Sequence, residues 1–170
     1  ILKCDENFDD LSNITKLHEV NLNDVITSID QIMRSSLYAT NKVQSHLYLD
    51  GNIEMIYVNK NSLKQILTNL IKNADESMSD KKEISIATKN ININGEGFVE
   101  IEIFDTGPGI PDDVLKNIYK PVTSTKGKKH SGLGLSIVKN LLDEMGSTIT
   151  CKTGKSGTTF SMHFPVKDKK

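Results

Sequence analysis

The chain has 170 residues, enough for one domain with its own hydrophobic core, or for one domain and a short appendage. Its 21 basic and 22 acidic side chains give a net charge of −1, so bulk charge provides no reason to expect a nucleic-acid partner or binding to an anionic membrane. No apolar run approaches the roughly 18 residues of a membrane span, and no signal segment opens the chain.

The two cysteines, Cys4 and Cys151, are far apart in the sequence and match no Cys-x-x-Cys spacing. We therefore expect free, reduced thiols, which are typical of a cytoplasmic protein. Because the first residue is Ile1 and not Met, we also expect a fragment of a longer protein. A membrane anchor or a sensing region would then lie upstream of the residues given.

Residues 1–20 form a polar stretch with few apolar positions. Ile14, Leu17 and Val20 recur at a weak helical spacing. We expect this stretch to be the end of an upstream helix or a linker, and we place the start of the main domain at residue 21. That domain is predicted to extend to residue 166, followed by a short tail at 167–170.

The first half of the main domain predicts a helix and two strands. Apolar residues recur at helical spacing from Asn21 to Met33, with an asparagine available as the N-cap. Residues 43–50 alternate in polarity as a strand does, and residues 53–59 follow across a Gly-Asn turn at 51–52. This order predicts a β-hairpin.

The second half continues the mixture of helices and strands. We predict a helix over 62–78, strands over 83–93 and 97–106, a helix that ends near Gly146, and a final hairpin over 148–153 and 158–164. Helices interleaved with several hairpins indicate an α/β sandwich, in which a mixed β-sheet is covered on one face by three main helices.

The helix predicted over 62–78 contains two asparagines in unusual positions. Asn69 and Asn73 are four residues apart and therefore lie on the same face, at the edge of its apolar stripe. Asparagine forms helices poorly, at a cost of about half a kcal/mol or more relative to alanine. The plain alternative is that both are solvated surface residues, but amide oxygens on a half-buried face can bind a hard cation such as Mg²⁺.

A second candidate lies in "FDTGPGIP", residues 104–111. Asp105 ends an apolar strand, and Gly107 and Gly109 turn the chain sharply, leaving little room for side chains. A carboxylate in this position can accept a hydrogen bond from an amino group, such as that of adenine, in an apolar slot. Alone, the stretch is more typical of an ordinary Asp-Thr-Gly turn than of a binding site.

The third candidate is the pair Gly132 and Gly134 at the start of a predicted helix. Backbone N–H groups at a helix N-terminus favour an anion such as phosphate. The spacing matches neither the P-loop nor the dinucleotide-binding fingerprint, because the third glycine of the fingerprint and the lysine of the P-loop are missing. The function of these two glycines therefore has to be inferred together with another motif in the chain.

Taken in order, these motifs resemble the ATP-binding domain of sensor histidine kinases in the GHKL superfamily, which also includes gyrase, Hsp90 and MutL ATPases. The matching segments are "NLIKNADES" as the N box, "DTGPGIP" and "GLGLSIVK" as the glycine boxes, "IYKPVTSTK" as the F box and "GTTFSMHFP" as the last strand. The resemblance covers about residues 21–166 and implies a Bergerat ATP-binding fold. Tyr119 and Val122 depart from the phenylalanines usual in the F box.

The resemblance implies a role for particular residues. Asp105 would accept from the adenine amino group, Asn73 would bind Mg²⁺ with support from Asn69, and Thr158 would hold a water near the base. Residues from about 118 to 131 would form a lid over ATP. The implied nucleotide contacts are Asn73, Asp105, Gly107, Gly109, Ile110, Lys126, Gly132, Leu133, Gly134, Leu135 and Thr158.

One position in the N box distinguishes enzymes that transfer the γ-phosphate of ATP from enzymes that hydrolyse ATP. Gyrase-like and Hsp90-like ATPases carry a glutamate one turn before the magnesium asparagine, where this chain has Asn69, which cannot accept a proton. Transfer to an external nucleophile is therefore favoured over efficient hydrolysis, with Asn69 and Asn73 as the catalytic pair. Glu76 lies nearby, and we expect it to face phosphate or solvent.

The expected phosphoacceptor is a histidine on a dimerisation hairpin upstream of this chain. His18 is followed by a glutamate but not by the usual proline, and His46 and His163 fall in predicted strands. We therefore expect a monomeric fragment of a homodimeric kinase, which serves a response regulator indirectly. The alternatives are a GHKL serine kinase of the anti-sigma type and a domain that binds ATP only as a regulatory ligand.

Overall fold

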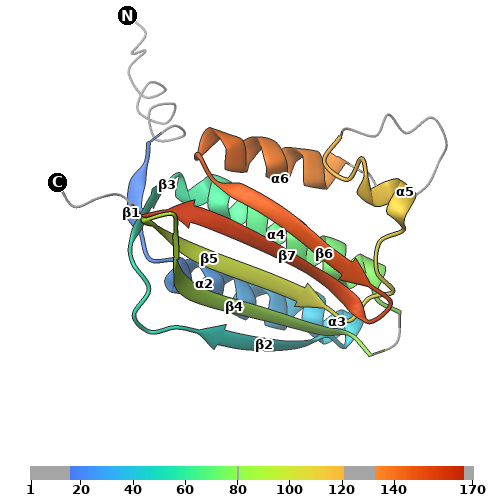
Figure 1. Cartoon of the computed structure of the whole chain (residues 1–170). Helices are drawn as coiled ribbons and strands as arrows, with labels where there is room; N and C mark the ends of the chain where they lie inside the picture. Colours follow the sequence, from blue (N-terminus) through green and yellow to red (C-terminus); the bar gives the residue numbers. More distant parts are fainter. Residues whose placement is uncertain (1–15, 80, 121–132, 167–170) are drawn as a thin grey trace, which may run out of the picture.

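The computed structural model describes residues 16–79, 81–120 and 133–166 (Figure 1). The strands are β1 (His18–Val20), β2 (Gln44–Leu49), β3 (Ile56–Val58), β4 (Glu83–Ile93), β5 (Glu96–Asp105), β6 (Thr148–Gly154) and β7 (Gly157–Pro165). The helices are α2 (Leu22–Met33), the π-helical turn η1 (Arg34–Tyr38), α3 (Ala39–Asn41), α4 (Lys60–Ser77), α5 (Asp112–Leu115) and α6 (Leu133–Glu144).

The main sheet has five strands in the order β2-β4-β5-β7-β6. β2 runs parallel to β4, and the other neighbours are antiparallel, so the sheet is mixed as predicted. Figure 1 shows α2, α4 and α6 on one face of this sheet, which confirms the predicted α/β sandwich with three main helices. Among the described residues, no helix has the length and apolar character needed to cross a membrane.

Helix α4 supplies the centre of the core. Asn59 caps its N-terminus, because the asparagine side chain accepts from the backbone N–H groups of Asn61 and Ser62 at 3.0 Å. Its apolar stripe lies against the sheet, and each member of the stripe is at most 1% exposed: Leu63, Ile66, Leu67, Leu70 and Ile71. Alternating residues of β4, such as Ile84 and Ile86, are buried on the facing side.

The predicted hairpin between residues 43–50 and 53–59 is wrong. β2 pairs in parallel with β4, and β3 pairs with β1 in a separate two-stranded sheet. Side chains from other elements hold the connection, because Asn23 Nδ2 donates to Asp50 O at 2.8 Å and Asn90 Nδ2 donates to Asn52 O at 2.9 Å. The Gly-Asn turn is present, but contacts with other elements, and not pairing between β2 and β3, determine the path of the chain after the turn.

The segment before α2 also differs from the expected helix end or linker. His18–Val20 is the strand β1, which pairs antiparallel with β3, and Val20 is 5% exposed. The weak helical spacing was misleading because Val20 is buried through strand pairing and packing in the core. Residues 1–15, including Cys4, lie outside the described residues, and Cys151 is a free cysteine.

A buried ion pair connects the end of α4 to the start of β4. Asp75 is 3% exposed, and Lys82 Nζ lies 2.9 Å from its Oδ1 and 3.0 Å from its backbone oxygen. Asn41 Nδ2 donates to the other carboxylate oxygen at 2.5 Å. The carboxylate is thus held by one cation and one amide in the interior, where an unpaired charge would be costly.

We predict that Lys82→Ala destabilises the fold strongly, because it leaves the buried Asp75 carboxylate without its cation. Removing one partner of a buried pair costs about 3–5 kcal/mol. The free energy of unfolding, measured by chemical denaturation, should show this loss. Lys81→Ala, at an exposed neighbouring position, should stay within about 0.5 kcal/mol of wild type. Equal effects of the two substitutions would contradict the assigned role of the ion pair.

Candidate functional site

A cavity of about 300 Å³ opens between the C-terminal half of α4, the segment after β5, the start of α6 and the start of β7. Its lining residues are Asn73, Ala74, Glu76, Ser77, Asp105, Gly109, Ile110, Val114, Ile118, Leu135, Thr158 and Phe160. Six of these were predicted from the sequence: Asn73, Asp105, Gly109, Ile110, Leu135 and Thr158. Segments far apart in the chain therefore meet at one cavity with mostly apolar walls.

Asp105 is the polar group buried at one end of the cavity. It is the last residue of β5 and is 6% exposed. Burial raises the pKa of its carboxyl above the ordinary value, and hydrogen bonds from the backbone N–H groups of Gly107 and Thr158 act in the opposite direction. The Gly107 N–H donates to Oδ1 at 2.8 Å. The site thus has a fixed acceptor in an apolar environment, which suits a ligand N–H group.

The two glycines after Asp105 are required by close packing. A Cβ added at Gly107 would lie 2.7 Å from both Asp105 Oδ1 and Ser77 Oγ. Gly109 has φ +84°, and a Cβ there would lie 2.2 Å from the carbonyl oxygen of Gly154. Side chains at either position would displace the backbone that positions the Asp105 carboxylate. Gly107 allows the backbone to pack closely against Asp105 and Ser77 without lining the cavity, whereas Gly109 lines the cavity.

Thr158 lies directly beside Asp105. The two residues are paired in the register of β5 and β7, and Thr158 is 4% exposed. The hydroxyl groups of Thr158 and Thr153 are 3.0 Å apart, and the Ile110 N–H donates to Thr153 Oγ1 at 2.8 Å. The cavity end therefore combines a carboxylate with a hydroxyl that is held by a second hydroxyl behind it.

Asn73 faces the cavity from the other side and lies next to the start of α6. A Cβ added at Gly134 would lie 3.6 Å from both Oδ1 and Nδ2 of Asn73, which is an ordinary contact distance. Asn69 lies one turn earlier on α4, is half-buried and does not line the cavity. The structure thus places Asn73, but not Asn69, among the residues that line the cavity.

A metal at this site would have few protein ligands. Among residues 16–79, 81–120 and 133–166, no three His, Cys, Asp or Glu side chains gather as a metal-binding group. The Asn73 amide oxygen fits a cation that takes its remaining ligands from water and from an anionic ligand, as Mg²⁺ does with phosphates.

Some predicted positions lie outside the described residues. These are Lys126, Gly132 and all of the predicted lid after residue 120. Leu133 is described only as the first residue of α6. Ile118, at the start of the predicted lid segment, lines the cavity.

Several cavity residues were not singled out from the sequence. Ala74, Val114 and Phe160 are apolar wall residues, and Ser77 follows the N-box asparagine by one helical turn. Helical spacing from Asn73 could have identified Ser77, because residues four apart share a face. The positions of Val114 and Phe160 depend on tertiary packing. Glu76, for which we expected a phosphate or solvent environment, is exposed and lines the cavity.

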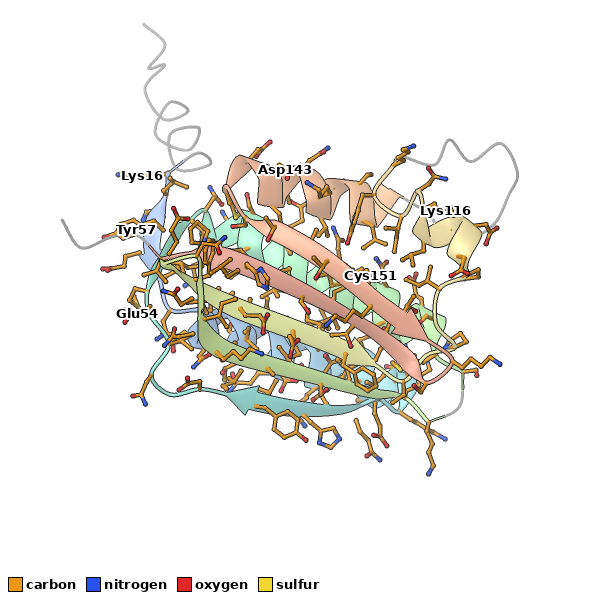
Figure 2. The ribbon with its side chains drawn as sticks, viewed as in Figure 1. Lys16, Glu54, Tyr57, Lys116, Asp143 and Cys151 are labelled. Carbon is orange, nitrogen blue, oxygen red and sulfur yellow. The ribbon has the colours of Figure 1, made fainter. Side chains whose placement is uncertain are left out.

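Cys151 and Tyr119 are neutral groups. Figure 2 labels Cys151 on β6, where burial, reinforced by the charge of Asp105, raises the pKa of its thiol to about 11. Burial also raises the pKa of Tyr119 to about 12. A thiol with so high a pKa is a poor nucleophile at neutral pH, and neither residue is among those that line the cavity.

Comparison with known proteins finds relatives that are named as kinases. The chain is 31% identical over 159 residues to the sensory histidine kinase/phosphatase NtrB of Rhizobium leguminosarum bv. phaseoli, covering 86% of this chain and 41% of the relative. It is 38% identical over 117 residues to sporulation kinase A of Bacillus subtilis, covering 67% of this chain and 18% of the relative. The chain thus spans less than half the length of these two relatives.

Solved structures agree with the sequence relatives. The catalytic domain of histidine kinase ThkA superposes with a TM-score of 0.77 at 25% identity, covering 89% of this chain and 97% of that domain. The family model described as histidine kinase-, DNA gyrase B- and HSP90-like ATPase matches residues 58–168, which include α4, the glycine turn after β5, α6 and the final hairpin. The chain therefore belongs to this family, as an ATP-binding domain of the type found in sensor histidine kinases.

Proposed function

We propose that this chain is the catalytic domain of a protein-histidine kinase, which binds ATP with Mg²⁺ in the cavity and transfers the γ-phosphate to a histidine on a dimerisation hairpin outside this chain. The observation that carries the proposal is the buried Asp105 carboxylate, fixed beside Thr158 at the end of an apolar cavity. Adenine offers the flat apolar faces and the exocyclic amino group that this end of the cavity can bind.

The phosphates would lie toward Asn73 and the start of α6. The first backbone N–H groups of a helix have no partner within the helix, and together with the helix dipole they favour an anion. Gly134 and Leu135 lie in the first turn of α6, and Gly134 adds no side chain between the helix and Asn73. This part of the proposal extends to Gly132 and Lys126 on the resemblance alone.

The magnesium role rests on a single amide. The Asn73 oxygen would hold the ion, which when bound neutralises phosphate charge and orients the triphosphate. Asn69 would act through Asn73, since it lies one turn away and does not line the cavity. Because Asn69 cannot take a proton from water, the domain would favour transfer over hydrolysis.

The proposed partners follow from the activity. The acceptor histidine would belong to an upstream hairpin of the same protein, which would form a homodimer in the cytoplasm, whereas the present chain alone would be monomeric. Histidine kinase ThkA has been crystallised in complex with its response regulator protein TrrA. We infer that a response regulator also receives the phosphate from the full protein to which this chain belongs.

We predict that Asp105→Asn weakens ATP binding about 5- to 150-fold, equivalent to roughly 1–3 kcal/mol for a mispaired buried polar group. The asparagine oxygen can still accept from the Gly107 N–H, so the melting temperature should change little. Titration calorimetry with a non-hydrolysable ATP analogue measures the loss, and Asp112→Asn on exposed α5 is the matched control. If the affinities for GTP and ATP differ by only a factor of a few, Asp105 does not select adenine.

We predict that Asn73→Ala removes most of the dependence of ATP affinity on Mg²⁺, because the proposed protein ligand is lost while phosphates and water remain. The measurement is the ratio of Kd values with Mg²⁺ and with EDTA. Asn69→Ala should reduce this ratio less. An unchanged ratio in Asn73→Ala would place the ion elsewhere.

We expect very slow ATP hydrolysis by this chain alone and phosphate transfer when a fragment carrying the upstream hairpin is added. The product should be acid-labile, as phosphohistidine is, and not acid-stable as phosphoserine is. Glu76→Gln should leave the hydrolysis rate unchanged if Glu76 is not a base for water. Fast turnover abolished by Glu76→Gln would instead identify a hydrolase, and an acid-stable product would indicate a serine kinase.

A further inference from the structure

A second group of polar side chains lies between α2, the π-helical turn η1 and β2, away from the cavity. Arg34 connects these elements, because its Nε donates to Asp30 Oδ2 at 2.6 Å and its Nη2 donates to the backbone oxygen of Ser45 at 2.8 Å. Asp30, Tyr38 and Ser45 are 4%, 3% and 9% exposed. None of the three lines the cavity, so this group is separate from the proposed nucleotide site.

The π-helical turn places Tyr38 on the same side of the helix as Asp30. In a regular α-helix, a residue eight positions further along lies about 80° around the axis. The segment Arg34–Tyr38 is π-helical, and its wider turn takes roughly one more residue, which cancels most of that angle. Aromatic side chains on helices point back toward the N-terminus. The Tyr38 ring is therefore directed toward Asp30, whose charge acts on the pKa of the Tyr38 hydroxyl.

Three oxygen atoms of this group are buried without a hydrogen-bond partner among the described residues. They are Asp30 Oδ1, the Tyr38 hydroxyl and Ser45 Oγ. Burial, reinforced by the charge of Asp30, raises the pKa of Tyr38 above its ordinary value, so the hydroxyl keeps its hydrogen at neutral pH. Buried polar atoms in folded proteins nearly always have a partner, either a protein group or an ordered water. Three such atoms in one group indicate a shared ligand that is small and polar.

The charges around this group are already balanced. The Asp30 carboxylate is paired with Arg34, and the Asp75 carboxylate, whose charge also acts on Tyr38, is paired with Lys82. A bound cation would add an uncompensated positive charge beside the Arg34 guanidinium, which is costly in a buried site. The ligand is therefore expected to be neutral.

We propose that a buried water molecule binds between Asp30, Tyr38 and Ser45 and joins η1 to β2. Asp30 Oδ1 can only accept, the Tyr38 hydroxyl can donate, and the Ser45 hydroxyl can do either. A water that accepts from the tyrosine and donates to the carboxylate satisfies both, and it has a hydrogen and a lone pair left for the serine. Buried waters typically make about three hydrogen bonds, which matches the groups available here. Occupancy of this site does not require ATP in the cavity.

A high-resolution crystal structure of the whole chain tests the site directly. We expect a water at about 2.6–3.2 Å from Asp30 Oδ1, the Tyr38 hydroxyl and Ser45 Oγ, both with and without a non-hydrolysable ATP analogue. A direct hydrogen bond from the Tyr38 hydroxyl to Asp30 or Ser45, with no water between them, would overturn the proposal. A site with several oxygen ligands at about 2.3–2.6 Å would hold a cation and would also overturn it.

Stability measurements test the same site in solution. Tyr38→Phe and Ser45→Ala each remove one partner of the water, and each should raise the equilibrium constant for unfolding about fivefold. The matched controls are Tyr48→Phe and Ser28→Ala at exposed positions, which should change that constant by less than about twofold. Because both buried substitutions act on one water, the double variant should change the constant by less than the product of the single effects. Independent effects of the two substitutions, or effects no larger than those of the controls, would rule out a shared ligand.

Discussion

The candidate site depends on a carboxylate buried at the end of a central strand. Asp105 is 6% exposed, and its environment disfavours the charged form, as the raised pKa of its carboxyl reflects. The Gly107 N–H and the pairing of β5 with β7 keep the group in place. An acceptor held in this way is already desolvated and oriented before any ligand arrives, so it discriminates strongly between ligands that donate to it and ligands that do not.

Helix α4 serves both the core and the site because successive residues face different directions. Asn73 faces the cavity, whereas Asp75, two residues later and about 200° around the helix, is buried in the ion pair with Lys82. The ion pair connects the end of α4 to β4 and so limits movement of the turn that carries Asn73 and Ser77. The stability of this corner and the geometry of the site are therefore linked through one helical turn.

The polar end of the cavity is assembled mainly by backbone geometry. Gly107 and Gly109 allow the chain after β5 to pass close to Ser77 and Gly154, and the Ile110 N–H then reaches Thr153. Side chains act at the last step, where one carboxylate and one hydroxyl, those of Asp105 and Thr158, line the cavity. This division explains why the glycine-rich motif carries most of the recognisable signal, although glycine itself contributes no functional group.

Local pattern in the sequence was sufficient for most helices and strands, for the layered α/β arrangement and for six of the residues around the cavity. These features follow from apolar periodicity, caps and glycine turns, which act over a few residues. The parallel pairing of β2 with β4, the strand β1, the walls formed by Val114 and Phe160, and the contact of Thr153 with Thr158 were decided only by the tertiary structure. Contacts between distant segments determine which strands pair and which side chains line the cavity. The local sequence of a segment does not specify which distant segment will pack against it.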